Sequence, residues 1–317
     1  MTGPTQRLAL KLKGPLEEGD TPPTRDQRAE RLRRSTESVI TLPTLPSSIE
    51  RLLEMVGRPD TSAKSLASVI SMDQVLTARL LRLANSSYYG FSQKVSTVSL
   101  ALVMLGFDAA KDIALTTTVM RSFKAHGNDP RFDLSRFWSH AVSVASASRY
   151  LSRVLRIGSP GEAFTAGILH DIGQVVLHAY HPEAFGKVLQ RVLEEGAPLL
   201  ETELEVLGAT HPQVGGWLCR RWNLPEAICT SVEFHHAPLE CKGGSGGLPG
   251  VVALADHFDG ISPEGGWLGG NGPDKLEGIL AALSRDGFVV ETGDVESLWK
   301  EVGLEIGRSK ELQDAFR

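Results

Sequence analysis

Several features are scarce in this chain of 317 residues, and each scarcity removes a class of protein. The three cysteines are an odd number without a C-x-x-C pair, which argues against a disulfide scaffold and a cysteine zinc site and favours a reducing compartment. No apolar run approaches the roughly 20 residues that a membrane helix needs. Residues 1–5 lack the charged-then-apolar layout of a secretion signal. We therefore expect a cytoplasmic protein with buried thiols and no membrane contact.

Positive charge is not in excess either. The net charge is −5, so nothing draws the whole chain toward nucleic acid or an anionic membrane, and no nucleic-acid partner is expected. One basic cluster, at Arg28, Arg31, Arg33 and Arg34, lies in a proline-bearing segment with little apolar periodicity. Residues 1–37 therefore read as a flexible tail with a helical stretch near residues 25–34. Its cluster is either solvated or in contact with a phosphate-bearing partner.

From residue 42 onward, apolar residues recur at helical spacing, and no convincing two-residue alternation predicts a strand. The pattern therefore predicts an all-α fold. In a first lobe, residues 38–127, Asp73 is the expected N-cap of one helix, and Gly106 is the expected end of the next. Asp108 is expected to cap the helix after that. A further stripe predicts a helix at residues 49–56.

A turn-rich break at residues 127–130 separates this lobe from a second bundle, residues 128–245. Ser135 is expected to cap a long helix that ends near Leu155. Ser159 and Glu162 have capping-box spacing, with Pro160 at the first helical position. Further helices are predicted at residues 183–195, 198–207, 211–222 and 225–234. Residues 246–317 are predicted to form a helical extension, with helices near 251–257, 274–284 and 294–302, that completes or packs on this bundle.

One of the nine histidines is followed directly by an aspartate, at an expected helix end. Other histidines and one further aspartate fall at intervals that suit the same mononuclear or dinuclear cation centre. The candidate metal ligands are His140, His170, Asp171, His211, His235, His236 and Asp256. Such a centre acidifies bound water and draws charge from a phosphoryl oxygen, so phosphoester cleavage becomes feasible.

Each candidate ligand also has a purely structural interpretation. His140 suits a hydrogen-bonded core histidine, and His211 suits a helix start. His235 and His236 suit a helix C-terminus, where a cationic imidazole interacts favourably with the helix dipole. Asp256 suits a solvated acid. Independent structural roles for all of them together are less plausible than for any one.

A polar segment with Asn85, Tyr88 and Tyr89 follows a strongly apolar helix. Asn85 can satisfy the carbonyl groups at the helix end, which is a structural role. An exposed tyrosine pair would instead offer a docking point for a partner protein, since tyrosine is favoured in interface hot spots. Both interpretations remain open from the residues alone.

Over about residues 41–236 the chain resembles the HDOD family, the HD-related output domain of bacterial signalling proteins. The segments that carry the resemblance are residues 42–46, 71–90, 99–106, 166–173, 210–215 and 234–238. The resemblance implies a small N-terminal helical lobe on a degenerate HD-type helical bundle. It also implies signal transduction, often in cyclic-dinucleotide or two-component networks, with no enzymatic activity established as the family's function. The implied partners are a sensor kinase, a cyclic-dinucleotide enzyme or a regulator.

The HDOD fold is similar to the HD-GYP phosphodiesterases, which hydrolyse cyclic di-GMP at a histidine–aspartate metal centre, and the seven candidate ligands match that centre's pattern. Three departures count against catalysis. Gln174 stands where a lysine usually follows, and an amide supplies no positive charge to the scissile phosphate. Arg136 stands where an acidic ligand is expected and would place a cation facing the metal. The Gly-Tyr-Pro signature is missing after His236.

We therefore expect a non-catalytic output or scaffold module that still binds a divalent metal (iron, manganese or another) at a remnant HD site. The alternative is a metal-dependent phosphohydrolase acting on a cyclic dinucleotide or another phosphoester, with Asp171 as its catalytic residue. A third interpretation is a ligand sensor, in which a nucleotide or metal binds without turnover and shifts a helix-packing equilibrium.

Overall fold

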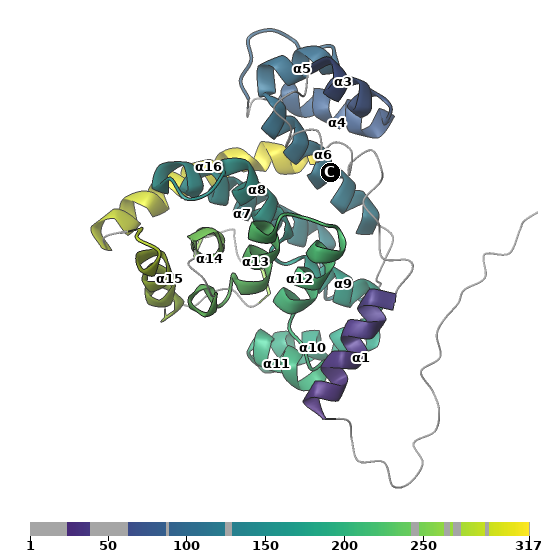
Figure 1. The fold of residues 1–317 in the computed structure, drawn as a ribbon, viewed down its shortest axis with the longest axis vertical. Coiled ribbons are helices and arrows are strands. Elements are labelled where there is room, and N and C mark those ends of the chain that lie inside the picture. The colour runs from purple at the N-terminus through teal and green to yellow at the C-terminus, as the bar shows by residue number, and fades with distance from the viewer. Residues whose placement is uncertain are drawn as a thin grey trace, which may run out of the picture.

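The computed structural model describes residues 24–38, 63–86, 89–123, 129–241, 247–262, 267–268, 274–288 and 292–316. Every regular element in these ranges is a helix, as the apolar spacing predicts. Figure 1 shows a small group of helices above a larger bundle, with the long C-terminal helix running between the two groups.

The small lobe consists of α3 (Ala63–Ser71), α4 (Gln74–Ala84), α5 (Val98–Leu105) and the first part of α6 (Phe107–Phe123). Asp73 caps α4 as predicted, because its carboxylate accepts two N–H groups of the first turn. Gly106 ends α5 at a φ of +83°, a backbone conformation that residues with a side chain rarely adopt. The helix predicted at residues 49–56 lies outside the described residues.

The larger bundle is built around α7. Its helices are α7 (Leu134–Leu155), α8 (Pro160–Leu169), α9 (Ile172–Tyr180), α10 (Pro182–Glu195), α11 (Leu199–Val206), α12 (His211–Arg221), α13 (Glu226–Phe234) and α14 (Gly247–Gly260). Helix α7 packs against α8, α14 and the C-terminal helix. Phe137, Ala141, Val144 and Leu151 recur at helical spacing along α7 and are fully buried. The surrounding helices pack against this apolar stripe of α7.

Three helix starts differ from the sequence prediction. Helix α7 is capped by Asp133 and not by Ser135, because the Asp133 carboxylate accepts the N–H groups of the first turn. Ser159 precedes α8, but its hydroxyl makes no capping hydrogen bond, so the predicted capping box does not form. Asp108 lies inside the first turn of α6 and not before it. There its charge still suits the positive end of the helix dipole.

The C-terminal residues form α15 (Asp274–Arg285) and α16 (Thr292–Phe316), and a short 3-10 helix, η1 (Pro238–Glu240), precedes α14. Helix α16 is much longer than the predicted piece at residues 294–302. It packs along α7 and also contacts α14 and, in the small lobe, α4. The extension therefore touches both parts of the protein.

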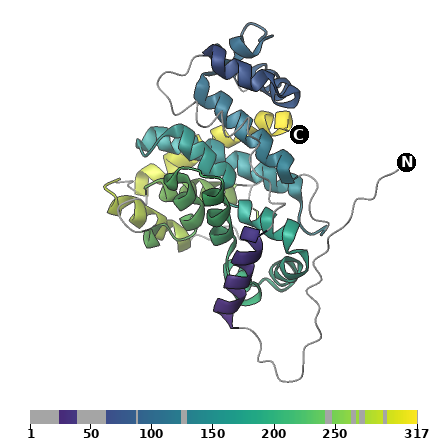
Figure 2. The same cartoon turned by 45° about the vertical axis from the view of Figure 1, so that its right-hand side comes forward.

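At the other end, α1 (Arg25–Ser38) lies against the side of the bundle and contacts α12 (Figure 2). Leu32 is buried there, and the backbone of Gly208 passes so close to Ala29 that a Cβ would overlap it. The predicted tail therefore folds as a packed helix from residue 25 onward. Residues 1–23 of that tail lie outside the described residues.

Two expectations from the scarce features can be compared with the structure. Cys219, Cys229 and Cys241 are buried free thiols, as predicted. Among the helices of the described ranges, none has the length and apolar character needed to cross a membrane.

Candidate metal centre

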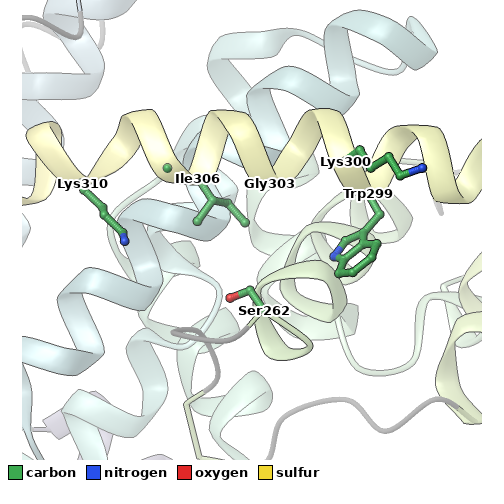
Figure 3. A pocket seen from close by; sticks show the side chains of 7 residues that line it. Ser262, Trp299, Lys300, Gly303, Ile306 and Lys310 are labelled. Carbon is green, nitrogen blue, oxygen red and sulfur yellow. The ribbon is translucent and has the colours of Figure 1, made fainter.

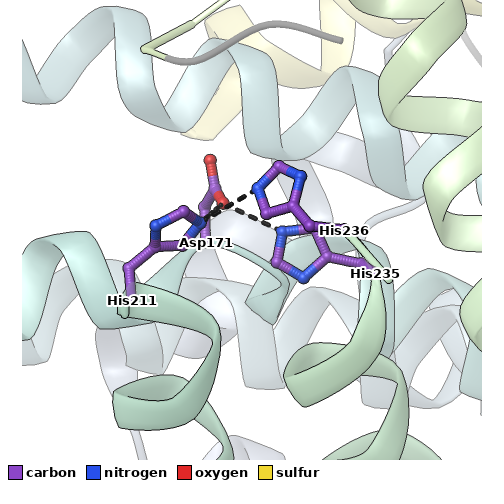
Figure 4. Close-up of side chains that lie close together, drawn as sticks. All are labelled: Asp171, His211, His235 and His236. Carbon is purple, nitrogen blue, oxygen red and sulfur yellow. Dashed lines mark hydrogen bonds and ion pairs between the residues drawn. The ribbon is translucent and has the colours of Figure 1, made fainter. Parts of the chain in front are cut away.

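All seven candidate ligands converge inside the larger bundle. They come from α7 (His140), the junction of α8 and α9 (His170 and Asp171), the first position of α12 (His211), the end of α13 (His235 and His236) and α14 (Asp256). The ligand atoms form two groups, and within each group they lie within 4.8 Å of one another. One group is Asp171, His211, His235 and His236, drawn in Figure 4. The other is His140, His170 and Asp256.

The carboxylate of Asp171 lies between the two groups. Its Oδ1 is 3.0 Å from Nε2 of His211 and 3.4 Å from Nε2 of His235 (Figure 4). Its Oδ2 is 3.5 Å from Nε2 of His170 and 3.8 Å from Nε2 of His140. A carboxylate with one oxygen toward each group can bridge two cations, as in two-metal phosphoester sites.

Two of the imidazoles are oriented by buried carboxylates. Nδ1 of His140 lies 2.7 Å from Oδ2 of Asp259, and Nδ1 of His211 lies 2.9 Å from Oε2 of Glu203. Each carboxylate accepts from Nδ1, so Nε2 points toward the centre. Carboxylate–histidine pairs of this kind fix the ring and make the other nitrogen a better metal ligand.

Two further imidazoles are oriented by backbone carbonyls. Nδ1 of His170 donates to the carbonyl of Gly167 at 2.7 Å, and Nδ1 of His235 donates to the carbonyl of Val232 at 2.8 Å. Because a carbonyl only accepts, the proton of each neutral ring sits on Nδ1. The lone pair on Nε2 is then directed at the centre, which is the arrangement that a metal ligand requires.

Asp259 and Glu203 are functional residues that the sequence interpretation missed. Glu203 is fully buried and also accepts the backbone N–H of His211 at 2.8 Å. Asp259 is buried as well and lies one helical turn after Asp256 in α14. An acid on an otherwise apolar helix face, as at Glu203 in α11, is the signal that could have revealed them, since charged residues are rarely buried without a partner.

Two buried atoms of the centre lack a hydrogen-bond partner within the described part of the chain, and one pair of ring nitrogens needs a proton between them to form a hydrogen bond. Oδ1 of Asp171 and Nε2 of His235 are buried and make no hydrogen bond of good geometry. Nε2 of His140 and Nε2 of His170 face each other at 3.1 Å. Unsatisfied buried polar groups cost about 1–3 kcal/mol each, and facing lone pairs repel unless a proton or a cation lies between them. The imidazole and carboxylate donors therefore fit a divalent metal.

Burial keeps two of the histidines neutral. It lowers the pKa of His170 to about 4, although the charge of Asp171 opposes the shift. Burial also lowers the pKa of His235, against the attraction of the neighbouring Asp171 carboxylate. Both rings are therefore uncharged at neutral pH and can act as metal ligands without losing a proton.

Carboxylates reverse this effect at the other two buried rings. Burial opposes the charging of His140, but the hydrogen bond and charge of Asp259 outweigh it and raise the pKa to about 9. Burial opposes the charging of His211 as well, but Glu203 and Asp171 raise its pKa to about 10. These protons occupy the space that a cation would take, so metal binding must displace them.

Gln174 lies between the Asp171 carboxylate and an aromatic cover. Its Nε2 donates to Oδ2 of Asp171 at 2.9 Å, and its Oε1 accepts from the indole Nε1 of Trp267 at 2.7 Å. The indole packs edge-on against Phe132 and Phe137, with ring centroids 5.1 Å and 5.9 Å away. The space at the centre that Trp267 helps to line does not admit a water-sized sphere. The centre is thus closed in this structure.

Two expectations for the centre are corrected by the structure. Arg136 does not face the metal position, because its side chain is exposed on the first turn of α7. The acidic residue that contacts His140 is Asp259 in α14, not a residue at position 136. Asp256 is buried, so it is not the solvated acid of the structural alternative.

Gly173 brings the two ligand-bearing helices α9 and α12 together. A Cβ on this residue would overlap the carbonyl of His211 and would lie 2.9 Å from the backbone N of Gly215. The backbones are therefore in direct contact, which only glycine permits. This contact sets the distance between Asp171, at the start of α9, and His211, at the start of α12.

The predicted partner-binding residues lie in the small lobe, away from the centre. The side chain of Asn85 donates to the carbonyls of Leu81 and Val95 and accepts the N–H of Val95, so its amide holds a loop in place. Tyr89 is half-buried and stacks with Phe91. Tyr88 lies outside the described residues. A docking role for this segment stays a prediction.

Fold and site together define an all-helical protein with a buried histidine–aspartate centre suited to divalent cations. The family profile of the HDOD domain matches residues 42–238, and the chain belongs to this family. The match covers the small lobe and the bundle as far as the start of η1. It ends before α14, which supplies Asp256 and Asp259.

The chain is similar to three further proteins. An uncharacterized protein of Treponema pallidum (strain Nichols) is 26% identical over 233 residues, which are 70% of this chain and 44% of that protein, so the chain spans less than half of its length. The structure of an HDOD domain protein with unknown function from Geobacter sulfurreducens is 26% identical, with a TM-score of 0.78 over 90% of this chain and 97% of that one. A structure from Shewanella amazonensis SB2B, named as a candidate phosphohydrolase, is 25% identical, with a TM-score of 0.70 over 91% of this chain and 99% of that one.

Proposed function

We propose that the chain is a cytoplasmic bacterial signalling module that holds a divalent metal, such as iron or manganese, as a structural group and acts through partner proteins. The observation that carries this proposal is the closed centre. Gln174 contacts Asp171 with an uncharged amide, and Trp267 holds that amide from the other side. A substrate phosphate would find no room there and, among the described residues that line the centre, no lysine or arginine to neutralise it.

The two ligand groups determine how metal would be held. His140, His170 and Asp256 form one set, His211, His235 and His236 form the other, and Asp171 contributes an oxygen to each. A bound divalent metal supplies Lewis acidity to an oxygen ligand. The protein adds oriented imidazoles and a shell of buried carboxylates, but no lysine or arginine among the described residues that line the centre to stabilise charge on a phosphate. Ligation without turnover follows from this set of groups.

The small lobe supports a role in protein contacts. Four large apolar side chains of the small lobe are exposed: Met72 in the turn between α3 and α4, Val75 on α4, and Leu100 and Val103 on α5, the last with 73% of its surface accessible. A contiguous exposed apolar patch is characteristic of protein interaction sites, and these side chains are the candidates for one on this lobe. The family resemblance supports a sensor kinase, a cyclic-dinucleotide enzyme or a regulator as the partner.

A second candidate function is metal-dependent hydrolysis of a cyclic dinucleotide or another phosphoester. The bridging position of Asp171 between two ligand groups favours it, and so does the similarity to the candidate phosphohydrolase of Shewanella amazonensis. In that function Asp171 would be the catalytic residue, and Trp267 would have to leave its present position.

Activity and metal content measured on the same preparation distinguish the two functions. Protein purified without chelator and supplied with manganese or iron should contain the metal. Its turnover of cyclic di-GMP and bis-p-nitrophenyl phosphate should not exceed that of Asp171→Ala. Robust turnover that Asp171→Ala abolishes would replace the signalling proposal with the hydrolase. Turnover that emerges only in Trp267→Ala would show that the closed centre is what suppresses hydrolysis.

A further inference from the structure

Helix α16 has a buried face and an exposed face. The buried residues recur at helical spacing: Val295, Leu298, Val302 and Ser309. The exposed face nevertheless carries two large apolar side chains, Trp299 with 38% and Leu304 with 66% of the surface accessible. Because tryptophan is enriched in interface hot spots, this face of α16 is a candidate contact surface for a protein.

Trp299 borders an apolar hollow of about 290 Å³ that follows this face of α16 (Figure 3). Gly303, Ile306 and Gly307 also line the hollow, and Ser262 lies below them. Among the described residues, the hollow shares no lining residue with the histidine–aspartate centre. Side chains that protrude from one helix fit into the grooves of another, so this stretch has the shape that receives a second helix.

The charges on this face are complementary to those of a second copy of the same helix. Glu296, Gly303 and Lys310 follow one another at intervals of seven residues, about two helical turns, so they lie in one line along α16. When two copies of α16 cross antiparallel at Gly303, Glu296 of each copy lies opposite Lys310 of the other. A parallel pair would instead set each of these charges opposite its own kind. The line of residues therefore favours the antiparallel crossing.

This pairing adds to the contacts that the two charged residues make within their own chain. Glu296 already holds Lys300 at 3.0 Å in an exposed ion pair. A carboxylate has about four acceptor sites and an ammonium group has three donors. Neither Glu296 nor Lys310 therefore has to be unpaired in the single chain for the two to meet between copies.

The same crossing also matches the apolar residues. Trp299 and Gly307 are each four positions from Gly303, so the indole of one copy lies over Gly307 of the other. A Cβ on Gly303 or on Gly307 would have no atom of the described chain within 4 Å. The second helix can therefore approach closely where the two copies cross, and Trp299 is covered by the other chain.

We propose that this face of α16 binds the same face of a second copy of the chain, as an antiparallel helix pair that crosses at Gly303. In such a two-fold contact every pair of residues forms twice. Helix α16 also packs on α7 and contacts α4, so the contact connects two copies through the helix that touches both lobes. The face lies apart from the metal centre, and the pairing does not depend on the proposed function.

Sedimentation velocity of the full chain over a range of concentrations tests the proposal. We expect a monomer–dimer equilibrium, and Gly303→Leu should raise its dissociation constant on the order of tenfold or more, because the new side chain keeps the two helices apart. Gly278→Leu is the control, because Gly278 also lies in a helix with no described atom within 4 Å of a Cβ, but in α15. A monomer at every concentration, or equal dissociation constants in the two variants, overturns the proposal.

Reversing the charges tests the antiparallel crossing. Glu296→Lys and Lys310→Glu should each raise the dissociation constant on the order of tenfold, because attraction becomes repulsion at both symmetric contacts. The double variant should restore the dimer, since it only exchanges the two charges between the copies. Contacts within one chain, such as that of Glu296 with Lys300, are not restored by this exchange. Losses in the single variants without recovery in the double variant, or no loss in any of them, would contradict the proposal.

Discussion

Two clusters of buried charge lie in this protein, and they differ in how their partners are provided. In the first, Asp112 of α6 is paired with Arg149 of α7 and accepts from the hydroxyl of Thr165 of α8 at 3.4 Å. The guanidinium of Arg149 also lies 4.1 Å from the ring centroid of Phe164. In the second, around Asp171, the ligand atoms Oδ1 of Asp171 and Nε2 of His235 are buried without a hydrogen bond of good geometry to the described residues.

The difference separates a cluster that is complete from one that requires a further component. Asp112 finds both a cation and a hydroxyl donor on neighbouring helices, so the polypeptide alone satisfies it. At the Asp171 centre, imidazole nitrogens and carboxylate oxygens of the described residues point toward one another, and these residues supply only protons to lie between them. Buried polar groups are tolerated when they are satisfied and costly when they are not. We therefore expect metal to stabilise the protein through the second cluster and to leave the first cluster unaffected.

The largest expected effect comes from replacing the two aspartates in turn. Asp171→Ala should lose the divalent metal, while Asp112→Asn should retain it. Metal at 100 times its dissociation constant should raise the free energy of unfolding of the wild-type protein by about 2.7 kcal/mol, and should not do so in Asp171→Ala. Elemental analysis and chemical denaturation with and without a chelator measure both. Equal metal content in the two variants would remove the distinction between the clusters.

The pH dependence of stability should isolate the first cluster. Burial raises the pKa of Asp112 from an ordinary 3.8 to about 6, against the attraction of Arg149. The folded state then holds this proton more tightly than the unfolded chain does. As the pH rises from about 4 to about 6, the wild-type protein should therefore lose about 2–3 kcal/mol of unfolding free energy relative to Asp112→Asn.

Below and above that window the two stability curves should run parallel, since Asp112 then has the same charge in both states. Denaturant titrations of the two proteins at a series of pH values provide the comparison. Curves that are parallel throughout would show that Arg149 keeps the Asp112 carboxylate ionised in the folded protein.

Removing the carboxylates that orient the histidines should weaken the second cluster without dismantling it. Glu203→Gln and Asp259→Asn keep the shape of the side chain but lose its charge. The affinity for metal should fall about 10- to 100-fold in each, because such partners hold the ring and increase its basicity. Competition with a chelator of known affinity measures the loss. Wild-type affinity in both variants would mean that His140 and His211 do not bind the metal.

The smallest effect is expected at the cover of the centre. Trp267→Phe keeps an aromatic ring near Phe132 and Phe137 but removes the donor to Gln174. The stability of the metal-loaded protein should fall by about 1 kcal/mol, the typical value of one hydrogen bond, and metal should exchange faster into a chelator. Denaturation and stopped-flow chelation measure the two effects. A variant identical to the wild type in both would mean that Trp267 does not secure the centre.

Local patterns predicted the helices well, but not all of their starts. Asp73 and Gly106 act where the sequence places them, because each is the strongest local candidate for its role. At α7 and α8, several polar residues compete within a few positions, and only the three-dimensional path of the chain decides between Asp133 and Ser135 or leaves Ser159 unused.

The convergence of the seven candidate ligands was predictable, but the partners of these residues were not. The His170-Asp171 pair and the family resemblance pointed to all seven ligands. Asp259, however, meets His140 across 119 positions of the chain, and Trp267 meets Gln174 across 93. No local pattern carries such contacts, because tertiary packing creates them. Arg136 was misplaced for a similar reason: the family pattern put it facing the metal, but its side chain is exposed on the first turn of α7.

The contact at Gly173 has a consequence for how this centre can change over time. Because α9 and α12 meet main chain to main chain there, the spacing of Asp171 and His211 is set by backbone contact and not by the packing of side chains. Substitutions in the surrounding core can then accumulate without pulling these two ligands apart. An arrangement of metal ligands that is fixed in this way can persist after the catalytic activity of such a centre has been lost.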